Sequence, residues 1–129
     1  MTIIDEIRAK LEKYPELEVV YTETSVEVKK PCESGFSVSC HVHGDEYVVG
    51  FDAWHEHQHT AEDAISLFSF GLSDKCRLAI NKRGGFEHRW SLQSWQDDGW
   101  ADYSTTGLFF FPFWKKKSIE YRQNNVIKG

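Results

Sequence analysis

Strict alternation of apolar and polar residues runs through Phe36-Ser37-Val38-Ser39-Cys40-His41-Val42-His43. Because successive side chains of a β-strand point to opposite faces, the pattern predicts a strand with one apolar and one solvent-facing side. Gly44-Asp45 is typical of a tight turn, and alternation resumes after it with Tyr47, Val49 and Phe51 on one side. The stretch 36–54 therefore predicts a β-hairpin.

Residues 17–29, before the hairpin, alternate in the same way and predict a further strand with one solvent-facing side. Residues 2–13 predict a helix, because they carry apolar side chains at helical spacing and start with a Thr-x-x-Asp capping pattern at Thr2. The same pattern at Thr60 starts a second predicted helix, which ends near Gly71.

The second half of the chain returns to alternation, and turn residues divide it into short predicted strands. These strands cover residues 76–80, 86–92, 100–104, 108–113 and 118–123. The order is helix, three strands, helix and three to five strands, or α-β-β-β-α-β-β-β(-β). It predicts an α+β fold in which two helices pack on one face of an antiparallel sheet. The similar starts of the two halves suggest an αβββ duplication.

The length of 129 residues and the absence of a linker predict a single α+β domain over residues 1–129, with a frayed tail at 124–129. Three widely spaced cysteines argue against a disulfide framework. The N-terminus is acidic, unlike a signal peptide, and no apolar run approaches the roughly 20 residues of a membrane span. We therefore expect a cytoplasmic protein. The net charge of −5 argues against a nucleic-acid partner.

Three histidines recur at every second position as His55, His57 and His59. On a strand, two such imidazoles lie about 7 Å apart on one face, close enough to bind one metal ion if a third ligand approaches. The set therefore predicts either a site for a divalent transition metal or, more simply, a hydrogen-bonded strand end. The nearest carboxylates in the sequence are Glu56, Glu62 and Asp63.

The expected hairpin register separates these histidines from the other alternating pair. With Gly44-Asp45 as the turn, His43 pairs with Glu46 and His41 with Val48, so His41 and His43 face solvent. If the return strand continued straight, His55 would lie roughly 23 Å beyond Val48. In that geometry His55 and His57 continue the apolar face of Phe51 and cannot share a metal ion with the first pair.

Aromatic residues concentrate late in the chain, where eleven of the nineteen lie between Phe86 and Tyr121. The densest run is Leu108-Phe109-Phe110-Phe111-Pro112-Phe113-Trp114, which is apolar on both faces if it is a strand. The run Lys115-Lys116-Lys117 follows it, and lysines at a sheet edge typically prevent that edge from pairing with another chain. We expect part of this segment to be a dimer seam or a partner groove. The candidate partner-binding residues are Trp54, Phe109, Phe110, Phe113 and Trp114.

These patterns favour a small cytosolic, non-catalytic binding module that recognises a protein partner or an apolar ligand through an aromatic-rich surface. The element order is similar to that of bacterial immunity proteins and secretion chaperones. We expect no cofactor, no nucleic-acid partner and no membrane partner. The aromatic-rich surface would also allow the protein to form a homodimer. The alternative is a small metal-dependent or acid–base enzyme that uses His55 and His57.

Overall fold

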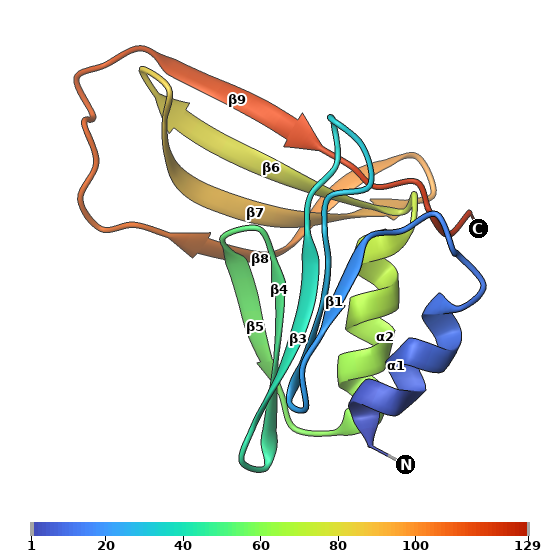
Figure 1. The fold of residues 1–129 in the computed structure, drawn as a ribbon. Coiled ribbons are helices and arrows are strands. Elements are labelled where there is room, and N and C mark those ends of the chain that lie inside the picture. Colours follow the sequence, from blue (N-terminus) through green and yellow to red (C-terminus); the bar gives the residue numbers. More distant parts are fainter. Residues whose placement is uncertain (1, 129) are drawn as a thin grey trace.

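The structure is a computed structural model, and it describes residues 2–128. It contains two helices and two antiparallel sheets, which confirms the predicted α+β fold (Figure 1). The strands divide between two sheets, whereas the sequence suggested one. The helices are α1 (Ile3–Leu11) and α2 (Ala61–Leu72).

The first sheet is a meander in which every strand pairs with the next one along the chain. Its strands are β1 (Val19–Tyr21), β2 (Ser25–Val28), β3 (Val38–His43), β4 (Glu46–Phe51) and β5 (Trp54–Gln58). The second sheet has the order β8-β7-β6-β9. Its strands are β6 (Cys76–Arg83), β7 (Phe86–Gln96), β8 (Gly99–Gly107) and β9 (Lys117–Arg122). The two sheets differ in strand number and in connection, so the fold does not show an αβββ duplication.

Both helices cover one face of the first sheet, and the second sheet lies across one end of it (Figure 1). Apolar side chains from both sheets and both helices meet in one hydrophobic core, which includes Phe51 of β4, Phe68 of α2 and Ile80 of β6. Since the helices lie on one side, the other face of the first sheet stays open to solvent. None of the helices in residues 2–128 is long and apolar enough to cross a membrane.

Both helices begin as the capping patterns predict. The Thr2 hydroxyl accepts from the Asp5 amide at 3.2 Å, and the Asp5 carboxylate accepts from the Thr2 amide at 3.2 Å. At α2, the Thr60 hydroxyl accepts from the Asp63 amide at 3.1 Å. Each threonine therefore provides a partner for an amide that the helix itself leaves without one.

The predicted strand over residues 17–29 is two strands joined by a turn. The Thr22 amide donates to the Ser25 carbonyl at 2.9 Å, and the two hydroxyls lie 2.7 Å apart. Strand β1 then pairs back on β2, with Val20 opposite Glu27. The alternation correctly predicted extended chain, but the expectation that Val20 shares the apolar side of Val26 and Val28 is wrong, because Val20 is 45% exposed while the other two are buried. Short polar residues such as Thr22 form local hydrogen bonds that turn the chain between them.

The expected register of β3 and β4 is confirmed, with His43 opposite Glu46 and His41 opposite Val48. The expected straight continuation beyond Phe51 is wrong. Asp52 adopts a positive φ of 52°, and the chain turns back as β5. Residue types with a short polar side chain tolerate this conformation best, and Asp52 is such a residue.

The predicted strand over residues 108–113 is a loop. Strands β8 and β9 lie at opposite edges of the second sheet, so their connection must cross three strand spacings, roughly 14 Å. Pro112 also lacks the amide that a central strand needs. The apolar run is therefore used to span the end of the sheet.

The tail expected to fray at 124–129 is instead attached to the fold as far as Ile127, and Gly129 lies outside the described residues. The Asn124 side chain is fully buried, accepts from the Phe36 amide at 3.0 Å and donates to the carbonyls of Phe36 and Gly71. The Ile127 amide donates to the Leu72 carbonyl at 3.0 Å. A buried polar side chain with all of its partners holds this end of the chain in place.

Candidate binding surface

The connection between β8 and β9, residues 108–116, crosses the end of the second sheet beside the β6–β7 turn. We call it the aromatic loop. The Leu108 amide donates to the His88 carbonyl at 2.7 Å at one side of the loop, and the Gly84 amide donates to the Lys116 carbonyl at 2.8 Å at the other. In Figure 1 the loop lies at the edge of the molecule farthest from the helices.

One aromatic side chain anchors the loop to the sheet. The Phe111 ring stacks on the His88 ring, with centroids 4.0 Å apart and planes 10° from parallel. Arg83 adds a second attachment, because its Nη1 donates to the Phe113 carbonyl at 3.3 Å. These contacts hold the middle of the loop against β6 and β7.

His88 provides a neutral surface for this stack. Burial lowers the pKa of His88 below its usual value, and the positive charges of Arg83, Arg89 and Lys117 lower it further. At neutral pH the imidazole is therefore uncharged and packs as an aromatic ring against Phe111.

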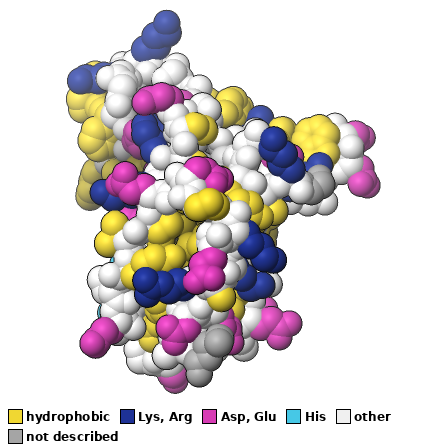
Figure 2. Space-filling model, turned by 45° about the vertical axis from the view of Figure 1, so that its right-hand side comes forward, with side chains coloured by type: hydrophobic (Ala, Val, Ile, Leu, Met, Phe, Trp, Pro, Cys, Tyr) yellow, Lys and Arg dark blue, Asp and Glu magenta, His cyan; other side chains and the backbone are white. Residues whose placement is uncertain are grey.

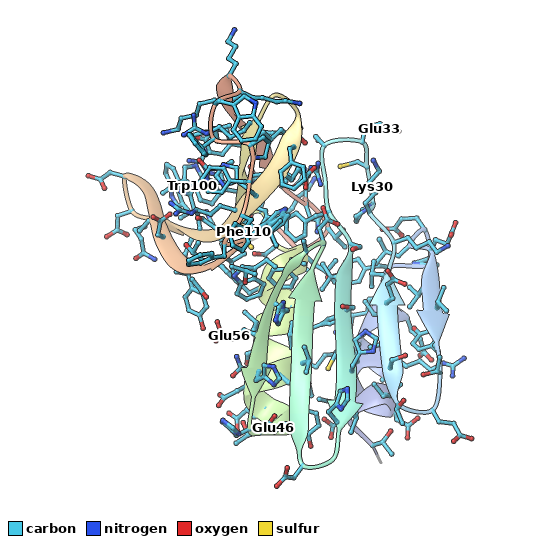
Figure 3. All side chains as sticks on the ribbon, turned by 90° about the vertical axis from the view of Figure 1, so that its left-hand side faces the viewer. Lys30, Glu33, Glu46, Glu56, Trp100 and Phe110 are labelled. Atoms are coloured by element: carbon cyan, nitrogen blue, oxygen red, sulfur yellow. The ribbon has the colours of Figure 1, made fainter. Side chains whose placement is uncertain are left out.

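The other four aromatic side chains of the loop point into solvent. Their exposed fractions are 89% for Phe109, 84% for Phe110, 68% for Phe113 and 72% for Trp114. In Figure 3 Phe110 is drawn in front of the lower part of the second sheet. Aromatic side chains of this size each bury on the order of 150 Å² or more, so the loop presents roughly 600 Å² of apolar surface. That area is at the upper limit of the largest apolar patch on an ordinary monomer.

Trp54, the fifth candidate partner-binding residue, lies elsewhere. It is fully buried in the core, where its ring stacks on Phe51 with centroids 5.0 Å apart. The turn at Asp52 places Trp54 opposite Phe51, and paired residues of neighbouring strands share one face. Trp54 is therefore a core residue and is not part of the exposed aromatic surface.

Positive charge gathers at the same end of the second sheet. Residues 82–90 and 105–119 contain six Lys and Arg against one Glu, a balance of +5 on a chain whose total is −5. The three lysines 115–117 are exposed directly after the aromatic side chains. On the face drawn in Figure 2, acidic side chains predominate at the opposite end of the molecule. The aromatic loop is thus next to the positive part of an otherwise negative protein.

The predicted histidine set lies on the open face of the first sheet, in contrast to the expected apolar face. His55 pairs with Gly50 and His57 with Val48, so both share the solvent-facing side of β4. Since Val48 also pairs with His41, the residues His41, Val48 and His57 form one row across three strands. The expected separation of roughly 23 Å along the sheet is therefore wrong, because β5 folds back on β4.

Glu46 is the acidic partner of this histidine face. Its carboxylate lies 3.2 Å from His57 Nδ1 and 3.7 Å from His59 Nδ1, while the rings of His55 and His57 are 6.3 Å apart. Figure 3 shows Glu46 at the end of the sheet remote from the second sheet. Within residues 2–128, no group of three His, Cys, Asp or Glu side chains has the geometry of a metal site. The nearest arrangement is this one carboxylate shared between two imidazoles.

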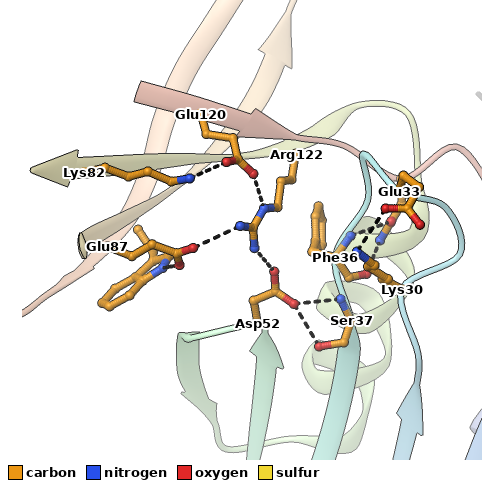
Figure 4. A network of polar contacts seen from close by, with 11 residues as sticks. Lys30, Glu33, Phe36, Ser37, Asp52, Lys82, Glu87, Glu120 and Arg122 are labelled. Atoms are coloured by element: carbon orange, nitrogen blue, oxygen red, sulfur yellow. Dashed lines mark hydrogen bonds and ion pairs between the residues drawn. The ribbon is translucent and has the colours of Figure 1, made fainter. Parts of the chain in front are cut away.

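A network of charged side chains joins the two sheets (Figure 4). Arg122 of β9 donates to Glu120 at 2.6 Å, to Asp52 of the β4–β5 turn at 2.7 Å and to Glu87 of β7 at 3.0 Å. Hydrogen bonds from Lys82 and Arg122 lower the pKa of Glu120 to about 2. Each member is paired, which is typical of a structural ion-pair network.

Sequence patterns did not point to His88 as the anchor of the loop or to Arg122 as the link between the sheets. His88 stood in an alternating aromatic row, and its contact with Phe111 depends on how the loop crosses the sheet. The three carboxylates around Arg122 come from three distant segments. No sequence spacing connects them, so only the pairing of the strands could have shown the network.

Two of the three cysteines lie in the core and one lies at the surface. Cys40 and Cys76 are buried and Cys32 is exposed, and all three are free thiols. Burial raises the pKa of Cys40 to about 11 and also raises that of Cys76. Thiols in such surroundings behave as small apolar side chains.

No family model matches this chain, and no curated protein or solved structure was found to be similar to it. Its function therefore has to be argued from its own surfaces.

Proposed function

We propose that the protein is a non-catalytic binding module that contacts its partner through the aromatic loop. The observation that carries this proposal is the exposure of Phe109, Phe110, Phe113 and Trp114 on a loop that Phe111 fixes to the sheet. A loop without a binding role could exchange these residues for polar ones at no cost to the core, because they do not belong to it.

The energy available at this surface is sufficient for binding. Burial of one large apolar side chain contributes about 1.5–3 kcal/mol, so four aromatic rings represent on the order of 10 kcal/mol before the costs of association. The backbone attachments to His88 and Gly84 restrict the loop before the partner arrives. Restriction of this kind lowers the entropy lost on binding.

The partner classes proposed from the sequence are a protein, including a second copy of this chain, and an apolar ligand. Residues 109–114 line an open depression of about 480 Å³ with their own side chains. Its walls are almost entirely apolar, which suits an apolar surface or ligand. We further propose a cytoplasmic location, which the three free cysteines support.

Photocross-linking tests this proposal. With p-benzoylphenylalanine in place of Phe110, irradiation of cells that contain the protein should give a discrete covalent adduct. A matched control carries the same residue in place of Val20, which is exposed on β1 of the first sheet. If residue 110 gives no more adduct than residue 20, the aromatic loop is not a contact surface.

The alternative from the sequence, an enzyme using His55 and His57, has one feature in its support: the carboxylate of Glu46 lies close to His57, and also to His59. His55 and His57 are nevertheless exposed to solvent on the open face of the first sheet. An enclosed pocket that could hold a substrate and exclude water is not formed by these side chains. The binding module is therefore the function that the structure supports better.

A further inference from the structure

We propose that the partner of the aromatic loop is the surface of a membrane that contains anionic lipids. This inference rests on the proposed function and names the class of its partner. The sequence led us to expect no membrane partner, but that expectation concerned segments that span a bilayer. A loop that enters only the interface needs neither a long apolar helix nor a positive total charge.

The shape of the loop favours a fluid apolar layer over a protein pocket. The ring planes of Phe109 and Phe110 meet at 79°, and those of Phe113 and Trp114 meet at 85°. The four rings thus form two edge-to-face pairs around one open apolar depression, and they differ from the single protruding anchor typical of protein hot spots. A lipid layer accepts apolar side chains in any orientation, because its molecules rearrange around them.

The order of residues along the loop follows the polarity of a membrane interface. Phenylalanines 109 and 110 form the most exposed apolar part, Trp114 follows, and lysines 115–117 come directly after it. Tryptophan is enriched at the level of the lipid headgroups, and lysine side chains reach from there to the phosphates. The backbone hydrogen bonds at Leu108 and Lys116 keep both sides of the loop on the sheet. The tip can thus enter the apolar layer while the lysines remain at the phosphates.

The charge distribution of the whole chain would orient the protein on such a surface. The balance of +5 in residues 82–90 and 105–119 leaves −10 on the rest of the chain. An anionic surface attracts the first part and repels the second. The end of the second sheet that carries the aromatic loop would then face the lipids.

Vesicle co-sedimentation measures this binding directly. We expect the protein to bind vesicles of phosphatidylcholine with about one third phosphatidylserine at least tenfold more tightly than vesicles of phosphatidylcholine alone. The double change Phe109→Ser with Phe110→Ser should weaken binding at least a hundredfold, because two large apolar side chains no longer enter the layer. Circular dichroism of the variant should match that of the wild-type protein, since both residues lie outside the core.

The lysines provide a second, independent test. Replacing lysines 115, 116 and 117 by Gln should weaken binding to the anionic vesicles about a hundredfold. The matched control replaces Lys13, Lys75 and Lys128 by Gln, which removes the same charge from exposed positions elsewhere. That control should bind within about twofold of the wild-type protein.

Lipids with brominated chains report the depth of the loop. They should quench part of the tryptophan fluorescence, and the change Trp114→Phe should remove most of that quenching. The lipid inference is overturned if the protein fails to bind anionic vesicles, or if it binds them equally well with and without lysines 115–117. Should residue 110 then still cross-link to a protein in cells, the proposed function survives and only the lipid partner is wrong.

Discussion

Arg122 is the residue on which the relative placement of the two sheets depends most. Its guanidinium binds carboxylates from the β4–β5 turn, from β7 and from its own strand, and these carboxylates are 24–41% exposed. The planar guanidinium has five donors, so one side chain can satisfy all three partners. The hydrogen bonds to Glu120 and Asp52 raise the pKa of Arg122 in spite of its partial burial, so it stays charged at every pH of interest.

We expect Arg122→Met to lower the free energy of unfolding by about 2 kcal/mol, because it leaves three half-buried carboxylates without their shared cation. Urea unfolding at neutral pH measures this change. Arg89→Met is a suitable control, since Arg89 is an exposed residue of β7 in the same sheet. Equal stability of the two variants would show that the network does not hold the sheets together.

Acid should weaken the same network. Because hydrogen bonds from Lys82 and Arg122 lower the pKa of Glu120 from 4.5 to about 2, the folded state favours the carboxylate form. The contribution of the Glu120 carboxylate to stability is fully present above pH 4.5 and is lost as the pH falls towards 2. Urea midpoints between pH 6 and pH 2 should therefore fall less steeply for Glu120→Gln than for the wild-type protein. Glu23→Gln, in the exposed β1–β2 turn, should leave the slope unchanged.

At the scale of elements, the sequence predicted local structure better than it predicted where strands end. Both helix starts and the register of the β3–β4 hairpin depend on neighbouring residues, and both were predicted correctly. The turn at Asp52 was missed, because Phe51-Asp52-Ala53-Trp54 contains none of the Gly or Pro residues that mark most turns. That turn decides which face His55 and Trp54 occupy, so the faces of both residues were predicted wrongly.

The aromatic run, residues 108–114, is a second case in which the sequence did not show where a strand ends. Its exposed aromatic residues were predicted as a contact surface, but as part of a strand. A strand and a spanning loop can share one composition, and only the strand order β8-β7-β6-β9 shows that the chain must cross the sheet there. Sequence patterns report local propensity, whereas the position of β9 beside β6 is a property of the whole fold.

The cap of α2 allows a direct test of an element that was predicted from sequence. Thr60→Ala removes the acceptor of the Asp63 amide and should lower the free energy of unfolding by about 1 kcal/mol. Ser66→Ala, at an exposed position within α2, is the control and should leave stability unchanged or slightly higher. An unchanged urea midpoint for Thr60→Ala would remove Thr60 from the cap.

The histidine face of β5 gives a further prediction. If His55 and His57 are solvated strand residues, changing both to Gln should lower stability only slightly and leave the metal content at zero in both proteins. Elemental analysis of protein purified without chelators measures this content. Stoichiometric zinc, nickel or iron that disappears in the variant would instead support the enzyme hypothesis, with Glu46 beside His57.

At the scale of the whole molecule, the residues that stabilise the fold are different from those that we propose to contact a partner. The core packs the helices against the sheets, the caps stabilise the helix starts and the Arg122 network joins the two sheets, whereas the aromatic loop belongs to none of these. Positive charge and exposed aromatic rings coincide at one end of the molecule, and negative charge dominates the remainder. A protein built in this way can lose the loop aromatics without loss of its fold, so their role can be tested apart from stability.

The accessibility of residue 110 inside cells tests the central claim most directly. In a Cys32→Ser background, which removes the exposed native thiol, Phe110→Cys can be labelled with a membrane-permeable maleimide, and Val20→Cys serves as the reference. Our account predicts that residue 110 reacts at least tenfold more slowly in cells than in the purified protein, while residue 20 reacts at similar rates in both. Equal reactivity of residue 110 in cells and in the purified protein would show that nothing covers the aromatic loop and would contradict the account.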